Sequence, residues 1–162
     1  MKKILIFMAI LFLSISVNVK ADSSSVRVSV YYVPDVYYNY KKDGMIYWGQ
    51  LGYIRADKQL AYCLDILTNI TTDTYFKGEI SNDIKEDMIL TSYFGFEYGK
   101  IGGFAYYAAA QQMIWKQMGI DVYFTDQSMG KGNIIDLSDI ISIIEERIKE
   151  YKRVPEIGNN FK

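Results

Sequence analysis

Two residues of this 162-residue chain could together do chemistry that neither would do alone. Cys63, in the stretch AYCLDI, is the one cysteine of the sequence. It cannot form a disulfide within the chain, so its thiol is either a small buried hydrophobic group or a reactive one. Gln111 lies 48 positions further along, in the stretch FAYYAAAQQMIWKQMG. A cysteine thiolate that attacks a glutamine carboxamide expels ammonia and leaves a thioester, so the pair predicts an internal Cys63–Gln111 thioester.

The position of Gln111 in its predicted helix, residues 103–118, is unusual. Read with helical spacing, one stripe of this segment is apolar except at its centre; its members are Phe104, Tyr107, Ala108, Gln111, Ile114, Trp115 and Met118. An unpartnered carboxamide on a packing face costs about 1–3 kcal/mol. We therefore expect Gln111 either to bond the backbone of a neighbouring strand or to be chemically used. Gln112 falls on the flank of the helix and is the weaker candidate.

Cys63 lies in a predicted strand, residues 60–65. Strand alternation places Leu60, Tyr62 and Leu64 on the larger apolar face, and Ala61, Cys63 and Asp65 on the other. Cys63 is therefore expected to face whatever covers the second side of the sheet. Asp65 shares that face and is either a proton acceptor for the site or a solvated residue at the strand end.

Periodicity and turn residues predict an α+β fold, with an antiparallel β-sheet in the N-terminal half packed with a few α-helices. The predicted strands are 26–33, which ends at Pro34-Asp35, two runs joined by a hairpin at Asp43-Gly44, then 51–54, 60–65 and 121–124. The predicted helices are 81–93, with Ser81 as N-cap and an end at Gly95, 103–118 stopped by Gly119, and a helix capped by Asp136 that runs to about Arg153 before Pro155.

The first 21 residues have the pattern of a secretory signal peptide. Lys2 and Lys3 precede an apolar run, and Val19-Lys20-Ala21 supplies small residues at the cleavage positions. Residues 22–162 are then expected to form a single exported domain. Of the 18 basic residues of the chain, three lie in the first 21, which leaves 15 against 19 acidic residues and a formal charge of −4. This balance does not favour a nucleic-acid partner.

The chain has no histidine. A histidine zinc site, a Cys–His dyad and a Ser–His–Asp triad are therefore excluded. A cysteine hydrolase or transglutaminase would lack its usual base.

Both stretches resemble the paired motifs of the bacterial Cys–Gln thioester domains found in Gram-positive surface adhesins. Tyr62-Cys63-Leu64 matches the cysteine motif, and the run from Ala110 to Trp115 matches the glutamine motif. The stretch ILTSYFGF and the C-terminal helix with its proline are also similar, so the resemblance covers roughly residues 44–155. The chain differs from many members at Ala110, where they carry Thr, and at Met113, where they carry Ala.

The resemblance implies a single-use covalent binder rather than a turnover enzyme. Its thioester, Cys63 with Gln111, would react with a lysine amine of a host or extracellular-matrix protein and form an isopeptide-like crosslink. The expected location is secreted or on the cell wall of a Gram-positive bacterium, with no cofactor and no metal, and with a membrane contacted only through the signal peptide or an anchor. Tyr62 and Trp115 are candidates for packing around the bond, or are ordinary aromatic core residues.

Two other functions remain open at this point. The first is a non-covalent surface-binding module of the same fold in which no thioester forms, and whose contact surface is the aromatic-rich sheet around VYYNY and MIYWG. Aromatic side chains are good interface anchors, although they are also favoured in ordinary strands. The second is a structural subunit of a pilus or of the cell envelope.

Overall fold

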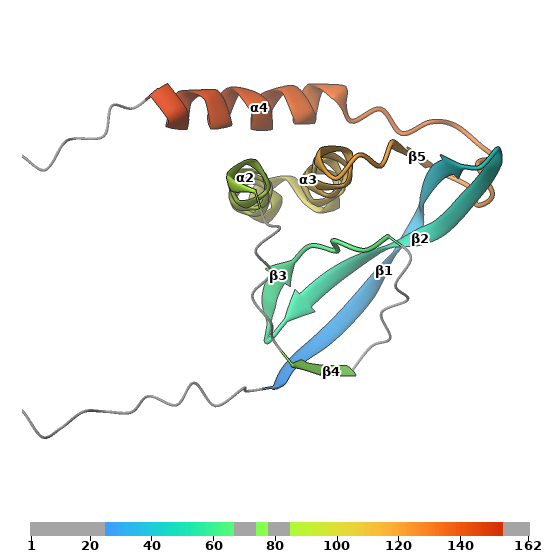
Figure 1. The fold of residues 1–162 in the computed structure, drawn as a ribbon, viewed down its shortest axis with the longest axis horizontal. Helices are drawn as coiled ribbons and strands as arrows, with labels where there is room; N and C mark the ends of the chain where they lie inside the picture. The colour runs from blue at the N-terminus through green and yellow to red at the C-terminus, as the bar shows by residue number, and fades with distance from the viewer. Residues whose placement is uncertain (1–24, 67–73, 78–84, 154–162) are drawn as a thin grey trace, which may run out of the picture.

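The computed structural model describes residues 25–66, 74–77 and 85–153. In this part of the chain the elements form three layers (Figure 1): an antiparallel sheet, a middle layer of helices α2 and α3, and helix α4 lying across them on the far side from the sheet. The predicted α+β class is confirmed. The predicted signal peptide, Ser81 and Pro155 lie outside the described residues.

The sheet is organised around one long hairpin. Strand β1, Ser25–Lys42, pairs antiparallel with β2, Met45–Ala56, through the predicted turn at Asp43-Gly44. Both turn residues have positive φ, 51° and 78°, as a tight two-residue hairpin turn requires. The predicted end of the first strand at Pro34-Asp35 is wrong, because the chain forms a bulge between Tyr32 and Tyr37 and the ladder then resumes.

Among the described residues, three short strands extend the sheet: β3, Gln59–Ala61, β4, Thr74–Lys77, and β5, Val122–Thr125. The order is β3-β2-β1-β4, and β5 pairs with the other end of β1. Strands β4 and β5 therefore pair with opposite ends of the 18-residue strand β1.

Within the described residues, each of the three predicted helices has a counterpart, but their ends differ. Helix α2, Glu86–Gly102, passes through Gly95, where the predicted segment stopped, because that glycine is buried against α3 and serves packing. The chain turns at Gly103, φ 67°, into α3, Phe104–Gln117. Helix α4, Ser138–Arg153, begins after Asp136, whose carboxylate accepts a hydrogen bond from the Ser138 N–H as predicted for its cap.

The core lies between the sheet and α3 and continues to α4. Tyr107, Ala109 and Ala110 of α3 are fully buried, as is Ile144 of α4. The helices α2 and α4 are also joined by an exposed ion pair between Lys152 and Asp87. Among the described helices, none is long and apolar enough to cross a lipid bilayer.

Candidate functional site

Cys63 does not lie in a strand, contrary to the sequence-based prediction. Strand β3 ends at Ala61, and residues 62–66 leave the sheet as irregular chain. The side chain of Tyr107 accounts for this separation: its hydroxyl accepts a hydrogen bond from the Ile54 N–H (3.4 Å) and donates one to the Ala61 carbonyl (3.2 Å). The alternation argument for the direction of the thiol therefore does not apply.

The structure nevertheless brings Cys63 and Gln111 together. The backbone N–H of Cys63 donates to Gln111 Oε1 at 2.8 Å, and Gln111 Nε2 donates to the backbone carbonyl of Cys63 at 2.7 Å. Gln111 is 1% exposed, so these two bonds supply partners for a carboxamide that would otherwise be buried without any. The cysteine residue and the carboxamide are thus held face to face.

Cys63 is a free cysteine and is half-buried. Its Sγ donates to the carbonyl oxygen of Asp65 at 2.9 Å. Burial raises the pKa of the Cys63 thiol, and the nearby Asp65 carboxylate raises it further. The thiol is therefore held mainly in its protonated, less nucleophilic form at neutral pH.

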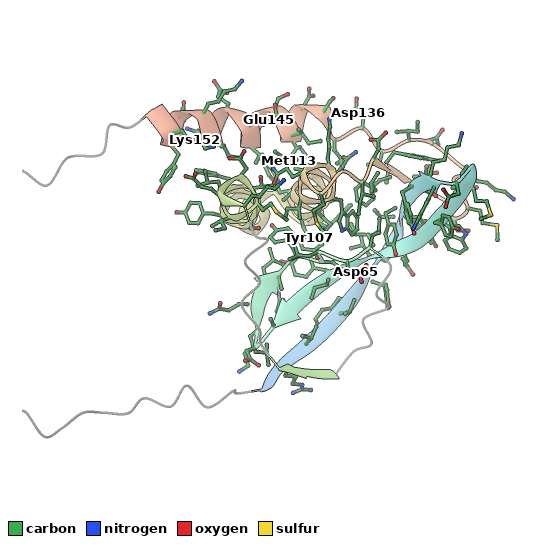
Figure 2. All side chains as sticks on the ribbon, in the orientation of Figure 1. Asp65, Tyr107, Met113, Asp136, Glu145 and Lys152 are labelled. Atoms are coloured by element: carbon green, nitrogen blue, oxygen red, sulfur yellow. The ribbon has the colours of Figure 1, made fainter. Side chains whose placement is uncertain are left out.

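Both residues line one cavity of about 170 Å³. Its wall also includes Tyr38 of β1, Gly49 and Gly52 of β2, and Trp115 of α3. Figure 2 shows Tyr107 in the space between α3 and the sheet, with Asp65 on the segment that follows β3. Tyr32, which is 56% exposed, belongs to the same lining, so the cavity reaches the molecular surface.

The two predicted packing residues are both close to the site, because Trp115 lines the cavity and Tyr62 directly precedes Cys63. Trp115, one helical turn after Gln111, is 3% exposed, and its ring centroid lies 5.2 Å from that of Tyr38. Its indole N–H has no acceptor among the described residues. Tyr62 stacks on Tyr107 with centroids 5.0 Å apart and interplanar angle 16°. Both residues belong to the aromatic core around the site.

The two other candidates, Gln112 and Asp65, do not have their side chains between Cys63 and Gln111. Gln112 Nε2 donates to the Val122 carbonyl of β5 at 2.6 Å, so this side chain ties α3 to the sheet and does not face Cys63. Asp65 is exposed and contributes its backbone carbonyl to the thiol.

Sequence reasoning missed the residues that shape the site. Tyr107 was placed only on the apolar stripe, and neither Tyr38 nor the glycines of β2 were singled out. A Cβ at Gly49 would lie 2.3 Å from Tyr38 Oη, so the glycine makes room for this ring. Glycine within an aromatic strand is a signal of such close approach and could have been used.

Comparison of the chain with protein-family models, with curated proteins and with solved structures finds no match. The resemblance to thioester domains therefore depends on the two motifs and on the residues quoted for them.

Proposed function

We propose that this protein is an exported covalent binder that carries a Cys63–Gln111 thioester. The observation that supports this most is the reciprocal pair of hydrogen bonds between the Cys63 backbone and the Gln111 carboxamide, at 2.8 and 2.7 Å. It holds the carbonyl to be attacked against the residue that attacks it. Such positioning can contribute several kcal/mol to a reaction between two groups of one molecule.

The bond would form by direct substitution at Gln111. The thiolate of Cys63 attacks the carboxamide carbon, the Cys63 N–H donates to the oxygen that becomes negative, and the nitrogen leaves as ammonia with the thiol proton. A carbon–sulfur bond replaces a carbon–nitrogen bond, and no electrons are gained or lost. Trp115 also lines this cavity, and its buried indole N–H, which has no acceptor among the described residues, is a candidate second donor.

The completed thioester would react once with a primary amine. The amine nitrogen bonds to the Gln111 carbonyl carbon, and Cys63 leaves as a thiol, so an amide joins the two molecules. A thiolate leaves readily because its ordinary pKa is about 8.5. The amine that fits the resemblance is a lysine of a host or matrix protein, and the location is the surface or surroundings of a Gram-positive cell.

The intact mass of the purified protein tests the proposal. We expect the wild type to be lighter than its sequence by one ammonia, and the Cys63→Ala variant to have its full mass. Methylamine should then raise the wild-type mass by one methylamine and leave the variant unchanged. A full-mass wild type whose thiol reacts freely with iodoacetamide would show that no thioester forms.

A second candidate function is non-covalent binding by the same fold. It is favoured by the hydrogen bonds of the unreacted state, since Gln111 and the Cys63 thiol both have partners. The exposed aromatic residues Tyr31, Tyr32 and Trp48 of the hairpin would then form the contact surface. The mass measurement separates this function from the first.

A further inference from the structure

The outer edge of β2 beside the cavity has no strand paired with it in the described part of the chain. Strand β1 pairs with β2 along its length, from Met45 to Ala56. Strand β3 pairs with the other side of β2 only from Ile54 to Ala56. From residue 45 to residue 53, one side of β2 is therefore open among the described residues. An open edge presents N–H and C=O groups to which another extended chain can bond.

The turns at both ends of β2 identify which backbone groups face this edge. Asp57 and Lys58 have φ of 46° and 72°, a two-residue hairpin turn, so Ala56 exchanges hydrogen bonds with Gln59 of β3. Because hydrogen-bonded and non-bonded positions alternate, Gly52 and Gln50 also turn their N–H and C=O groups outward.

The other end of β2 gives the same assignment. The turn at Asp43-Gly44 makes Lys42 and Met45 a hydrogen-bonded pair, so Met45 points to β1. By the same alternation the next outward positions are Ile46, Trp48 and Gln50. The two hairpins agree at Gln50.

The open edge adjoins the candidate site. The Tyr107 hydroxyl binds Ile54 N–H and Ala61 O where β3 leaves β2, and the next outward residue is Gly52. Gly52 and Gln50 then line the cavity that holds Cys63 and Gln111. The cavity thus lies beside the stretch of β2 that β3 leaves unpaired.

We infer that an extended segment of the partner protein adds to β2 along residues 48–52 and presents a lysine side chain to Gln111. The added strand would bond through its backbone to Trp48, Gln50 and Gly52. Alternate side chains of a strand point to one face, so one lysine can enter the cavity while its neighbours stay outside. This inference rests on the proposed thioester and specifies the form of its partner. The partner segment must be extended and contain a lysine, whereas the identities of the neighbouring side chains matter little.

Two matched peptides test the edge. One is a capped seven-residue peptide of Thr and Val with a central Lys, and the other is the same peptide N-methylated at alternate backbone nitrogens, which cannot pair. We expect the first to form its adduct with the purified protein at least about ten-fold faster, a difference of about 1.4 kcal/mol. The same protein preparation should react with methylamine at the same rate in each experiment. This control measures the reactivity of the thioester without any contribution from the β2 edge.

A pair of variants in β2 of the protein tests the same edge independently of the peptide. Trp48→Pro removes the outward N–H, whereas Trp48→Thr removes the same aromatic ring and keeps the N–H. We expect the proline variant to lose the rate advantage of the unmethylated peptide and the threonine variant to keep it. Equal rates for both variants would overturn the inference, provided that their circular dichroism and methylamine rates match.

A binding measurement separates this inference from the proposed function. In Cys63→Ala protein, which cannot react, the unmethylated peptide should slow hydrogen exchange of the Gly52 and Gln50 amides by about ten-fold or more. This result is expected even if no thioester is found in the wild type. Amides that are already protected in the free protein, or a dimer formed through this edge in light scattering, would overturn the inference.

Discussion

At Gln111, burial and hydrogen bonding depend on each other. The side chain is 1% exposed, and both ends of its carboxamide bond the backbone of Cys63, a residue on an irregular segment. A regular strand at residues 62–64 would use these backbone groups in its own ladder. The end of β3 at Ala61 therefore frees the Cys63 N–H and C=O for Gln111.

Replacing the two neighbouring glutamines should separate their roles. Gln111→Ala removes the bonded partner of both Cys63 backbone groups, so we expect a loss of about 1–3 kcal/mol in the free energy of unfolding and a full-sequence mass. Gln112→Ala loses one hydrogen bond to the Val122 carbonyl, so we expect its free energy of unfolding to fall by about 0.5–1.5 kcal/mol. Its mass should remain one ammonia below the sequence mass. Urea unfolding and intact mass measure both effects. The reverse pattern of masses would contradict the placement of Gln111.

At the scale of elements, the contact between α2 and α3 positions the site. Gly95 of α2 is buried against α3, where an added Cβ would lie 2.3 Å from Ala110 Cβ and 2.9 Å from Tyr62 Oη. Ala110 precedes Gln111, and Tyr62 precedes Cys63. A displacement at this contact would therefore move both partners of the proposed bond.

Gly95→Ala should disturb that contact. Alanine favours a helix over glycine by about 1 kcal/mol, but a forced overlap in a packed core costs about 1–3 kcal/mol, so we expect a net loss of stability. We also expect a smaller fraction of the protein to have lost one ammonia, as the thioester form does. Gly119→Ala is the control, because its Cβ would meet nothing within 4 Å and only its φ of +83° is unfavourable. It should lower the melting temperature and leave the mass unchanged. A fully formed thioester in Gly95→Ala would disprove the link.

At the scale of the whole molecule, the buried Tyr107 and the partly buried Tyr62 join the layers. Tyr107 connects α3 to β2 and β3 through its hydroxyl, and Tyr62 stacks on it. Burial raises the pKa of both hydroxyls above the ordinary value of 10.0, with a hydrogen bond from Ile54 offsetting part of the rise at Tyr107. These hydroxyls therefore lose their protons at a lower pH in the unfolded chain than in the folded protein.

Stability should accordingly fall at alkaline pH. Because the folded-state pKa values are raised, the stabilising contribution is complete below pH 10 and is lost as the pH rises above it, by up to about 1.4 kcal/mol per pH unit for each group. Tyr107→Phe removes one of them, so its free energy of unfolding should decline less steeply between pH 10 and 11. Urea unfolding across this range checks the slopes. Equal slopes in the two proteins would contradict the burial argument.

Local patterns were sufficient for much of the fold. Asp43-Gly44 between aromatic runs predicted the hairpin, and Asp136 predicted the start of the C-terminal helix. Pro34-Asp35 and Gly95 were misread as ends, because a local breaker can be absorbed by a bulge or by a close helix contact. The apolar stripe of α3 correctly separated Gln111 from Gln112, since helical spacing is a local property.

The sequence by itself determined that one carboxamide would lie at the centre of a buried helix face and would need a partner. It also contained the single cysteine that could react with this carboxamide, but not how the two residues would meet. That was decided by tertiary structure, because β3 ends where the Tyr107 hydroxyl, 46 residues beyond Ala61, binds between the strands. The contact depends on side chains from two distant elements, so no local periodicity could predict that the Cys63 backbone would turn to Gln111.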